Sequence, residues 1–322
     1  MASISSRKSA SLKADPLTHL KVGVLSGGNS SERAVSLRSG KAVYEALLRS
    51  GISVCRIDPK RSPQKTRLNL SRIDLAFLAL HGKGGEDGTI QKRLEKVGIP
   101  YVGSDSRGSR LAFDKVEAKK IFKRQGIPTP AWRTFSRKDW RGLKSFPSPF
   151  FVKPVADGSS IGVFLVEDFR RSAEKLIHAL KRYPVLLAER RMEGREFTVG
   201  ILGNQALPVI ELRPKRKFYD YKAKYTRGMT EYLVPAPISP SQAKKFQNLA
   251  LRVHRALKLR DFSRVDLMTD SKGNPFVLEA NTIPGFTELS LLPKAARQAG
   301  ISFEALCLKL VGMAWSRKNG KA

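Results

Sequence analysis

The chain has little cysteine and no long apolar segment, and both shortages exclude whole classes of protein. Only Cys55 and Cys307 occur among its 322 residues, so neither a disulfide framework nor a zinc cluster is expected, and a reducing compartment fits. No run approaches the roughly 20 apolar residues of a membrane span. Residues 1–20 lack the apolar core of a secretory signal, and we expect a disordered basic tail there. We therefore expect a cytoplasmic protein that does not associate with membranes.

Acidic residues are scarce relative to basic ones. The chain carries 60 Lys and Arg against 28 Asp and Glu, which gives a formal net charge of +32. Such a balance first suggests nucleic acid or an anionic membrane as a partner. The basic residues are spread along the chain in short pairs such as Lys119-Lys120, however, and we interpret most of them as solvated helix faces. No specific nucleic-acid partner is expected.

The order of apolar segments and glycine turns indicates an α/β (α+β) fold. A buried strand at 21–25 runs into a glycine turn, and a helix with apolar residues at helical spacing follows. Further strands are expected at 52–57 and 75–80. Strand, helix and strand in this order predict a βαβ unit in an open parallel sheet.

The pattern of the chain changes after residue 103, where a lysine-rich helix at 114–125 is followed mainly by strands. The predicted strands of this part lie at 150–154, 162–166, 185–189, 196–202, 206–212, 264–268 and 276–280. The first two are expected to form an antiparallel hairpin. A length of 322 residues is too great for one small core. We divide the folded chain into three lobes, at 21–103, 104–188 and 189–322.

Two carboxylates are predicted to face each other near the C-terminus. Lys272-Gly273 predicts a two-residue hairpin turn, and this register sets Asp266 directly opposite Glu279. Facing carboxylates repel each other unless a cation lies between them. Together with the amide oxygen of Asn281 they offer the hard oxygen ligands that Mg²⁺ prefers. Spacing alone leaves a structural ion pair with Arg264 and a nearby lysine as an equal alternative.

A strand lysine is followed by a Gly/Ser loop in the middle of the chain. Lys153 and the loop at 158–162 offer a positive charge, backbone N–H groups and hydroxyls, which together suit phosphate. The sequence is not a Walker A motif, and Asp157-Gly158 is by itself a strong signal for an ordinary hairpin. No nucleophile elbow or Ser/His/Asp order occurs, so nothing indicates covalent catalysis.

Glu32 lies where a helix is expected to begin, three residues after Asn29. This spacing indicates a capping box, and the competing role is a carboxylate at the strand edge where open α/β sheets bind ligands. His81 ends a strand at the same edge, and the glycines of 82–88 precede another helix, which makes an anion-friendly N-terminus. The other histidines are interpreted as tail or surface residues: His19, His178 and His254.

Five segments of the chain carry a family resemblance. They lie, in this order, at 25–33, 79–88, 152–154 with 158–162, 218–225 and 278–285. In sequence and order they resemble the D-alanine–D-alanine ligases, over about residues 21–314. The resemblance implies a three-lobed ATP-grasp fold, homodimerisation and a two-step reaction. ATP phosphorylates the carboxylate of one D-alanine, and the amine of a second D-alanine attacks the acyl phosphate.

The resemblance also implies how ATP and its metal are held. Mg²⁺, or Mn²⁺ in its place, would be bound by Asp266, Glu279 and Asn281. The residues implied for the nucleotide are Lys115 and Lys153 at the phosphates, Glu189 and Glu196 at the adenine and ribose, and Lys224 as a further contact.

The implied substrate site uses residues from all parts of the chain. For the first D-alanine these are Glu32 at its ammonium, Ser159 and Tyr225 as orienting groups, and His81 nearby. For the tetrahedral intermediate they are Arg264 and the Gly285 N–H. For the carboxylate of the second D-alanine they are Ser290 and Leu291.

Two other functions fit parts of the sequence. One is another ligase of the same fold, such as a D-alanine–D-lactate ligase or an enzyme that adds amino acids to a protein. The loop that ends at Lys224-Tyr225 favours the dipeptide ligase. The other is a basic nucleic-acid-binding protein on a ligase scaffold. The presence of the complete metal set and of both phosphate lysines argues against this function.

Overall fold

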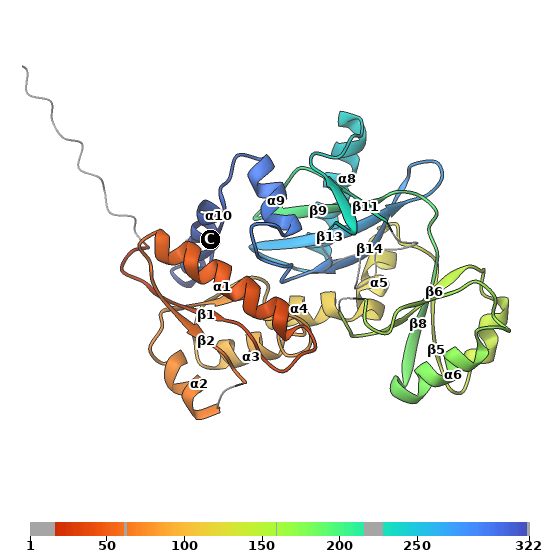
Figure 1. Cartoon of the computed structure of the whole chain (residues 1–322), viewed down its shortest axis with the longest axis horizontal. Coiled ribbons are helices and arrows are strands. Elements are labelled where there is room, and N and C mark those ends of the chain that lie inside the picture. The colour runs from red at the N-terminus through yellow and green to blue at the C-terminus, as the bar shows by residue number, and fades with distance from the viewer. Residues whose placement is uncertain (1–16, 61–62, 159, 216–227, 321–322) are drawn as a thin grey trace, which may run out of the picture.

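The computed structural model describes residues 17–60, 63–158, 160–215 and 228–320. Over these residues the chain forms β-sheets of four, six and four strands (Figure 1). The sheet built last along the chain lies between the other two in Figure 1. The expected mixed α/β architecture is therefore confirmed.

The N-terminal sheet is parallel, as the strand–helix–strand order predicted. Its order is β2-β1-β3-β4, and its strands are β1 (Lys21–Leu25), β2 (Ser53–Ile57), β3 (Leu75–Leu78) and β4 (Tyr101–Val102). Its helices are α1 (Arg33–Arg49), α2 (Pro63–Leu70) and α3 (Thr89–Lys96). Val24 and Phe77 pack with the distant Phe286 on one face, whereas Leu78 packs with Leu94 of α3 on the other. Since parallel strands end at one edge, the loops after β1 and β3 meet there.

A second, antiparallel sheet follows in the middle of the chain. Its order is β5-β8-β6-β7, with β5 (Trp132–Ser136), β6 (Phe150–Pro154), β7 (Phe164–Val166) and β8 (Val185–Arg190). The predicted hairpin is confirmed, because Phe150 pairs with Val166. Helix α6 (Ala173–Arg182) packs Leu176 and Leu180 onto this sheet, and a 3₁₀ helix occupies Trp140–Ser145.

The largest sheet holds the C-terminal strands. Its order is β12-β11-β9-β13-β14, with β10 beside β9; the strands are β9 (Glu196–Leu202), β10 (Gln205–Ala206), β11 (Ile210–Pro214), β12 (Thr230–Leu233), β13 (Phe262–Thr269) and β14 (Pro275–Asn281). The single strand predicted at 206–212 is wrong, because the chain leaves the sheet between β10 and β11 around Pro208, which has no N–H for a ladder. Helices α8 (Pro240–Ala256) and α9 (Leu291–Gln298) both pack on β9.

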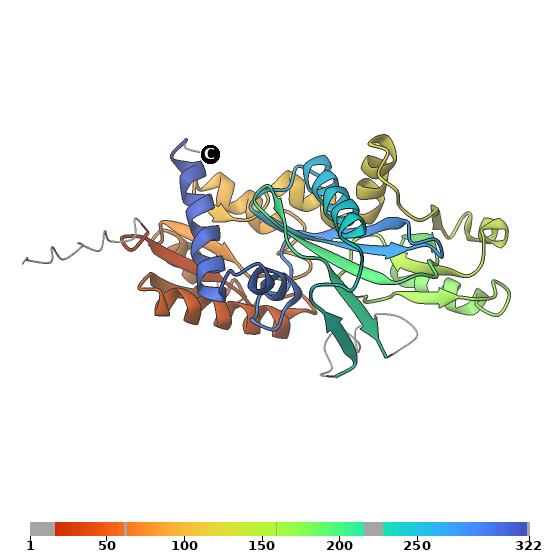
Figure 2. The same ribbon diagram turned by 90° about the horizontal axis from the view of Figure 1, so that it is seen from above.

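Helices α4 (Ser106–Phe113) and α5 (Lys115–Arg124) connect the N-terminal sheet to the middle sheet, and α10 (Phe303–Lys318) ends the chain. Helix α4 leads into α5, and Asp114 caps α5 by accepting from the backbone N–H groups of Val116 and Glu117. Helix α10 packs against α1, β3 and β4 (Figures 1 and 2). The N-terminal and C-terminal parts of the chain therefore share one hydrophobic core.

Two expectations about the surface need correction. Residues 17–20 were assigned to the tail, but they form a turn that buries Leu20 in the core. His254 is buried rather than on the surface, and its Nδ1 lies 2.8 Å from Ser263 Oγ. In the part of the chain that the structure describes, no single helix is long and apolar enough to span a membrane; α9 and α10 meet that test only as a pair bent by 102°.

Candidate active site

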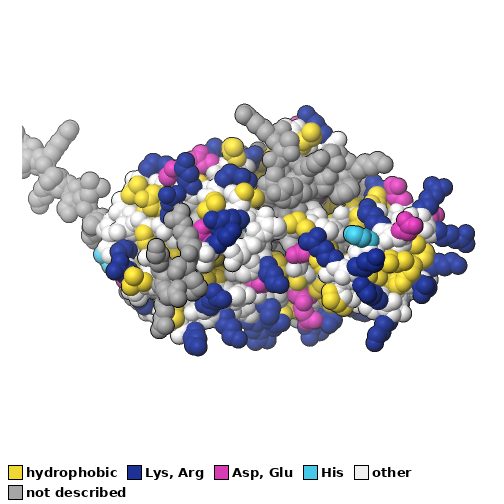
Figure 3. All heavy atoms as spheres, turned by 60° about the horizontal axis from the view of Figure 1, so that its bottom comes forward, with side chains coloured by type: hydrophobic (Ala, Val, Ile, Leu, Met, Phe, Trp, Pro, Cys, Tyr) yellow, Lys and Arg dark blue, Asp and Glu magenta, His cyan; other side chains and the backbone are white. Residues whose placement is uncertain are grey.

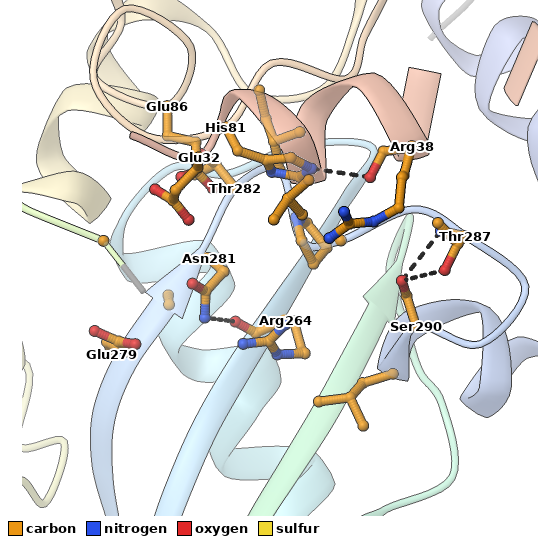
Figure 4. Close-up of a pocket in the computed structure, with 18 of the residues that line it drawn as sticks. Glu32, Arg38, His81, Glu86, Arg264, Glu279, Asn281, Thr282, Thr287 and Ser290 are labelled. Atoms are coloured by element: carbon orange, nitrogen blue, oxygen red, sulfur yellow. Dashed lines mark hydrogen bonds between the residues drawn. The ribbon is translucent and has the colours of Figure 1, made fainter. Parts of the chain in front are cut away.

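A cavity of about 740 Å³ lies between the N-terminal sheet and the C-terminal sheet. Its walls come from the loops after β1 and β3, the first turns of α1, strands β13 and β14, and the start of α9 (Figure 4). The predicted site residues that line it are Glu32, His81, Lys115, Arg264, Glu279, Asn281, Gly285, Ser290 and Leu291. The structure thus brings together residues more than 200 positions apart in sequence.

The remaining predicted residues fall into two groups. Four do not line this cavity: Lys153, Glu189, Glu196 and Asp266. Three lie outside the described residues: Ser159, Lys224 and Tyr225.

Glu32 precedes helix α1 and is nearly buried, with 6% of its surface exposed. Its side chain makes no capping hydrogen bond, so the predicted capping box does not form. A Cβ atom on Gly82 or Gly158 would lie 2.6 Å or 2.7 Å from Glu32 Oε2. A side chain at either position would push the Glu32 carboxylate away, and the positive φ of Gly82 also favours glycine there.

Glu86 is a second carboxyl beside Glu32 that the sequence did not single out (Figure 4). Its Oε2 accepts a hydrogen bond from the Gly82 N–H at 2.9 Å. Burial and the neighbouring charge of Glu32 raise the pKa of Glu86 to about 8. Near pH 7 Glu86 is therefore mostly protonated, and the two carboxyls form an acidic wall whose negative charge lies on Glu32.

His81 is buried between the same wall and α1. Its Nε2 lies 3.0 Å from Ser39 Oγ, and Ser39 Oγ in turn accepts from the Phe286 N–H at 3.2 Å. Burial lowers the pKa of His81 to about 4. The imidazole is therefore neutral near pH 7 and connects α1 to the loop after β14.

Asp266 pairs with Glu279 across β13 and β14, as predicted. The predicted two-residue turn is wrong, because Thr269 pairs with Pro275 and the turn has one more residue. A bulge between Asp266 and Leu267 compensates for that residue and restores the predicted pairing.

The carboxylate of Asp266 is held by its neighbours. Arg264 donates to both of its oxygens, at 2.9 Å and 2.8 Å, Asn281 Nδ2 donates at 2.9 Å, and Thr198 Oγ1 donates at 2.6 Å. The ion pair with Arg264 that competed with the metal interpretation is therefore present. A carboxylate offers about four lone-pair positions and these four bonds fill them, so a cation at Asp266 would have to displace at least one of the donors.

Glu279 reaches into the cavity, and its Oε2 lies 3.7 Å from Lys115 Nζ. Lys115 Nζ also donates to the Asp157 carbonyl at 2.7 Å, which connects α5 to the loop after β6. Among the described residues no group of three His, Cys, Asp or Glu side chains is arranged to hold a metal ion. A metal bound by Asp266 and Glu279 would therefore need the amide oxygen of Asn281, and these hard oxygen donors suit Mg²⁺.

Glu189 lies in a buried ionic network behind the cavity. Its Oε2 is 2.9 Å from Lys153 Nζ and 3.4 Å from Lys119 Nζ, and its exposed fraction is 2%. Burial alone would raise the pKa of Glu189, but the two lysine charges outweigh it and lower this pKa. Lys119 is itself 1% exposed, so its interpretation as a solvated helix face is wrong. In this structure the Glu189 carboxylate is therefore bound in ion pairs with both lysines.

Ser290 precedes α9 at the opposite end of the cavity. Its hydroxyl does not cap α9 but bonds to Thr287, 3.1 Å from the backbone nitrogen and 2.9 Å from Oγ1. A Cβ on Gly285 would lie 3.2 Å from Ser290 Oγ, so the two residues are in close contact. The backbone N–H groups at the start of α9 form an anion-friendly wall.

Two protein-family models match the sequence of this chain. A model described as D-ala D-ala ligase N-terminus matches residues 58–104, and one described as D-ala D-ala ligase C-terminus matches residues 121–312. The chain belongs to the D-alanine–D-alanine ligase family.

Relatives of this D-alanine–D-alanine ligase family match almost the whole chain. The D-alanine–D-alanine ligase of Aquifex aeolicus is 44% identical over 288 residues, which cover 89% of this chain and 98% of the relative. The crystal structure of D-alanine–D-alanine ligase from Bacillus anthracis is 33% identical with a TM-score of 0.84, and covers 94% of this chain and 100% of its own. The same enzyme complexed with ATP is 31% identical with a TM-score of 0.82 and the same coverage. The ATP-grasp fold implied by the resemblance is confirmed.

Two more residues that line the cavity of this ligase-family chain were not predicted. Arg38 follows Glu32 on α1, and Lys294 lies one turn after Ser290 on α9. In sequence they resemble any other exposed basic residue of helices in a chain of charge +32. Only their positions in the fold distinguish them.

Proposed function

We propose that this cavity is where the chain joins two D-alanine molecules, in the cytoplasm, with ATP as the source of energy. Family membership makes the chain an ATP-dependent D-alanine–D-alanine ligase whose product serves peptidoglycan precursor synthesis. One observation carries the assignment of the site. Glu32, Arg264 and Ser290 lie in one cavity, in positions suited to an ammonium, a developing oxyanion and a carboxylate.

The first D-alanine would lie against the acidic wall. The nearly buried Glu32 carboxylate supplies a charge-assisted bond for the ammonium, and the neighbouring Glu86, which its raised pKa keeps protonated near pH 7, adds a second oxygen acceptor. The substrate carboxylate then extends toward Arg264 and the Gly285 N–H. This orientation places the group to be phosphorylated at the metal side of the cavity.

The phosphates would be held by Lys115, at the cavity wall, and Lys153, which lies behind it beside Glu189. Mg²⁺ held by Asp266, Glu279 and Asn281 would neutralise phosphate charge during transfer. The chain's own residues supply the remaining positioning, because phosphoryl transfer depends mainly on orientation and charge stabilisation.

The second D-alanine would bind at the Ser290 end with Leu291. Its neutral amine attacks the acyl phosphate carbon, the C–O bond to phosphate breaks, and inorganic phosphate leaves. The nitrogen gives up one proton to the released phosphate or to solvent as the amide bond forms. Arg264 and the Gly285 N–H would stabilise the negative charge on the carbonyl oxygen in the tetrahedral intermediate. Ser159 and Tyr225 are proposed to orient the first substrate with Glu32.

Neither rival function has support from these findings. A D-alanine–D-lactate ligase would use the same fold, but the family match is to dipeptide ligases. On the face drawn in Figure 3, Lys and Arg side chains are distributed from one end of the molecule to the other rather than gathered in one groove. Nonspecific attraction to polyanions is what such a surface supports. We also propose a homodimer, as is usual in this family.

A phosphate-release assay with ATP and Mg²⁺ tests the proposal. D-Alanine alone should give phosphate and dipeptide in equal amounts, and added D-lactate should give little ester product. A DNA mobility shift at low and physiological salt would run beside it. No phosphate release dependent on D-alanine, or sequence-selective DNA binding at physiological salt, would refute the proposed function.

A further inference from the structure

The cavity has opposite charge at its two ends. Glu32, Glu86 and Glu279 lie on one side of Figure 4, and Arg38 lies on the other with Thr287 and Ser290. The acidic end suits an ammonium, as proposed above. At the basic end, Arg38 adds a full positive charge to the Ser290 hydroxyl and the N-terminus of α9.

Arg38 belongs to the face of α1 that lines the cavity. Glu32, Val35 and Ser39 line the same cavity, at the three- and four-residue spacing that puts residues on one helix face. Figure 4 shows the Arg38 guanidinium directed toward the space between His81 and Ser290. No ion pair or hydrogen bond joins this guanidinium to any other residue that the structure describes. Its charge is therefore available to a ligand.

Lys294 approaches the same end from α9. Its backbone N–H bonds to the Ser290 carbonyl at 3.0 Å, so the two residues are stacked on one helix face. Helical side chains lean toward the N-terminus, so the Lys294 side chain leans toward the turn that holds Ser290. The ammonium lies 4.5 Å from the ring centroid of Tyr232, another residue of the cavity wall. Lys294 is thus half-buried and held near the site rather than extended into solvent.

We propose that Arg38 and Lys294 bind the carboxylate of the acceptor D-alanine from two sides, and so determine that the acceptor must be an anion. The inference rests on the proposed function, since it assigns the acceptor end of the same cavity. Two cations in a partly enclosed site attract a carboxylate strongly, because the local dielectric is lower than that of water. They repel the ammonium form of the acceptor and so favour the neutral amine that attacks.

A competition between two acceptors tests this inference. D-Alaninamide has no carboxylate to phosphorylate, so it can enter only as the acceptor. With ATP and a mixture of D-alanine and D-alaninamide, the ratio of the two dipeptide products reports the preference for a charged acceptor. Wild type should favour D-alanine strongly. In the double variant Arg38→Met with Lys294→Met this preference should fall by about tenfold or more.

Two further variants separate charge from structure. Lys41→Met removes a positive charge from the same helix, where Lys41 pairs with Glu45 in solvent, and should leave the ratio unchanged. Arg38→Lys with Lys294→Arg keeps both charges and should restore the wild-type ratio. An unchanged ratio in the Met double variant, or an equal loss of both products, would overturn the inference. If wild type makes no dipeptide at all, the proposed function itself has failed.

Discussion

Asp266 lies directly opposite Glu279 across the β13–β14 pair, with Arg264 bound to both oxygens of the aspartate. Two carboxylates at facing positions of a strand pair repel, so their arrangement needs cations on both sides. Arg264 supplies one positive charge and Lys115 another. Of the two carboxylates, Glu279 lines the cavity. The pair is therefore our proposed position for the metal and the reacting phosphate.

Removing either carboxylate charge should raise the Mg²⁺ requirement of the reaction. We expect Asp266→Asn and Glu279→Gln each to increase the Mg²⁺ concentration for half-maximal turnover by about tenfold or more. Activity titrated against free Mg²⁺ measures this, with Glu45→Gln, which removes a carboxylate paired with Lys41 on the surface of α1, as the control. Wild-type Mg²⁺ dependence in both variants would disprove the metal assignment.

Glu32→Gln should impair binding of the first D-alanine much more than it lowers stability. The Glu32 side chain makes no capping bond, so the variant should melt within a few degrees of wild type. Loss of a carboxylate–ammonium bond in a nearly buried position should raise the lower of the two KM values for D-alanine by about tenfold or more. Thermal melts and initial rates over a wide D-alanine range measure both. Lower stability with unchanged kinetics would show that Glu32 is structural.

The Glu86 carboxyl should make stability fall as pH rises. Its pKa is about 8 in the folded chain, against an ordinary value of 4.5. Below pH 4.5 the carboxyl is protonated in both states and has no effect. Between these values the unfolded chain ionises while the folded chain keeps its proton, so stability decreases, and the full cost remains above pH 8.

Glu86→Gln removes this cost, because the amide resembles the protonated acid. The Tm of the variant should match that of wild type near pH 4.5 and exceed it by several degrees at pH 9. In a chain of this size, each kcal/mol of unfolding free energy shifts the Tm by about 2–4 °C. Melting curves across this pH range measure the difference. A constant Tm difference at all pH values would contradict the raised pKa.

Glu189→Gln should destabilise the fold severely. The substitution leaves Lys119 and Lys153 buried without their shared anion, and breaking a buried pair in this way costs about 3–5 kcal/mol. Glu117→Gln breaks an exposed pair with Lys120 and should cost about 1 kcal/mol or less. Denaturant unfolding of the two variants gives both free energies. Equal, small losses would mean that the buried network is not needed for stability.

The hairpin that carries Asp266 shows how far the sequence alone could predict the site. Alternation along each strand and the glycine at 273 gave the right partner for Asp266. The turn was nevertheless wrong by one residue, and the bulge beside Asp266 compensated for the error. A bulge depends on how neighbouring strands twist and pack, so local sequence does not reveal it. Glu32 and His81 could be placed at the cavity from the sequence because both follow the ends of predicted strands. Ser290 was expected only from the family resemblance.

Buried charge was the main feature that sequence could not show. Lys119 lies in a helix rich in lysine and was interpreted as solvated, yet it is buried against Glu189. His254 was likewise expected on the surface and is buried beside Ser263. Such residues are buried because a partner on a distant strand lies beside them. The spacing of residues within one helix does not predict that partner.

An isotope experiment tests the ligase mechanism most directly. D-Alanine labelled with ¹⁸O in its carboxylate is incubated with ATP, Mg²⁺ and the chain, and the inorganic phosphate is analysed by mass spectrometry. If the carboxylate is phosphorylated and the amine then displaces phosphate, the oxygen that joined carbon to phosphorus leaves with the phosphate. We predict one ¹⁸O atom in each phosphate released. Unlabelled phosphate, with both ¹⁸O atoms retained in the organic product, would contradict the acyl-phosphate mechanism.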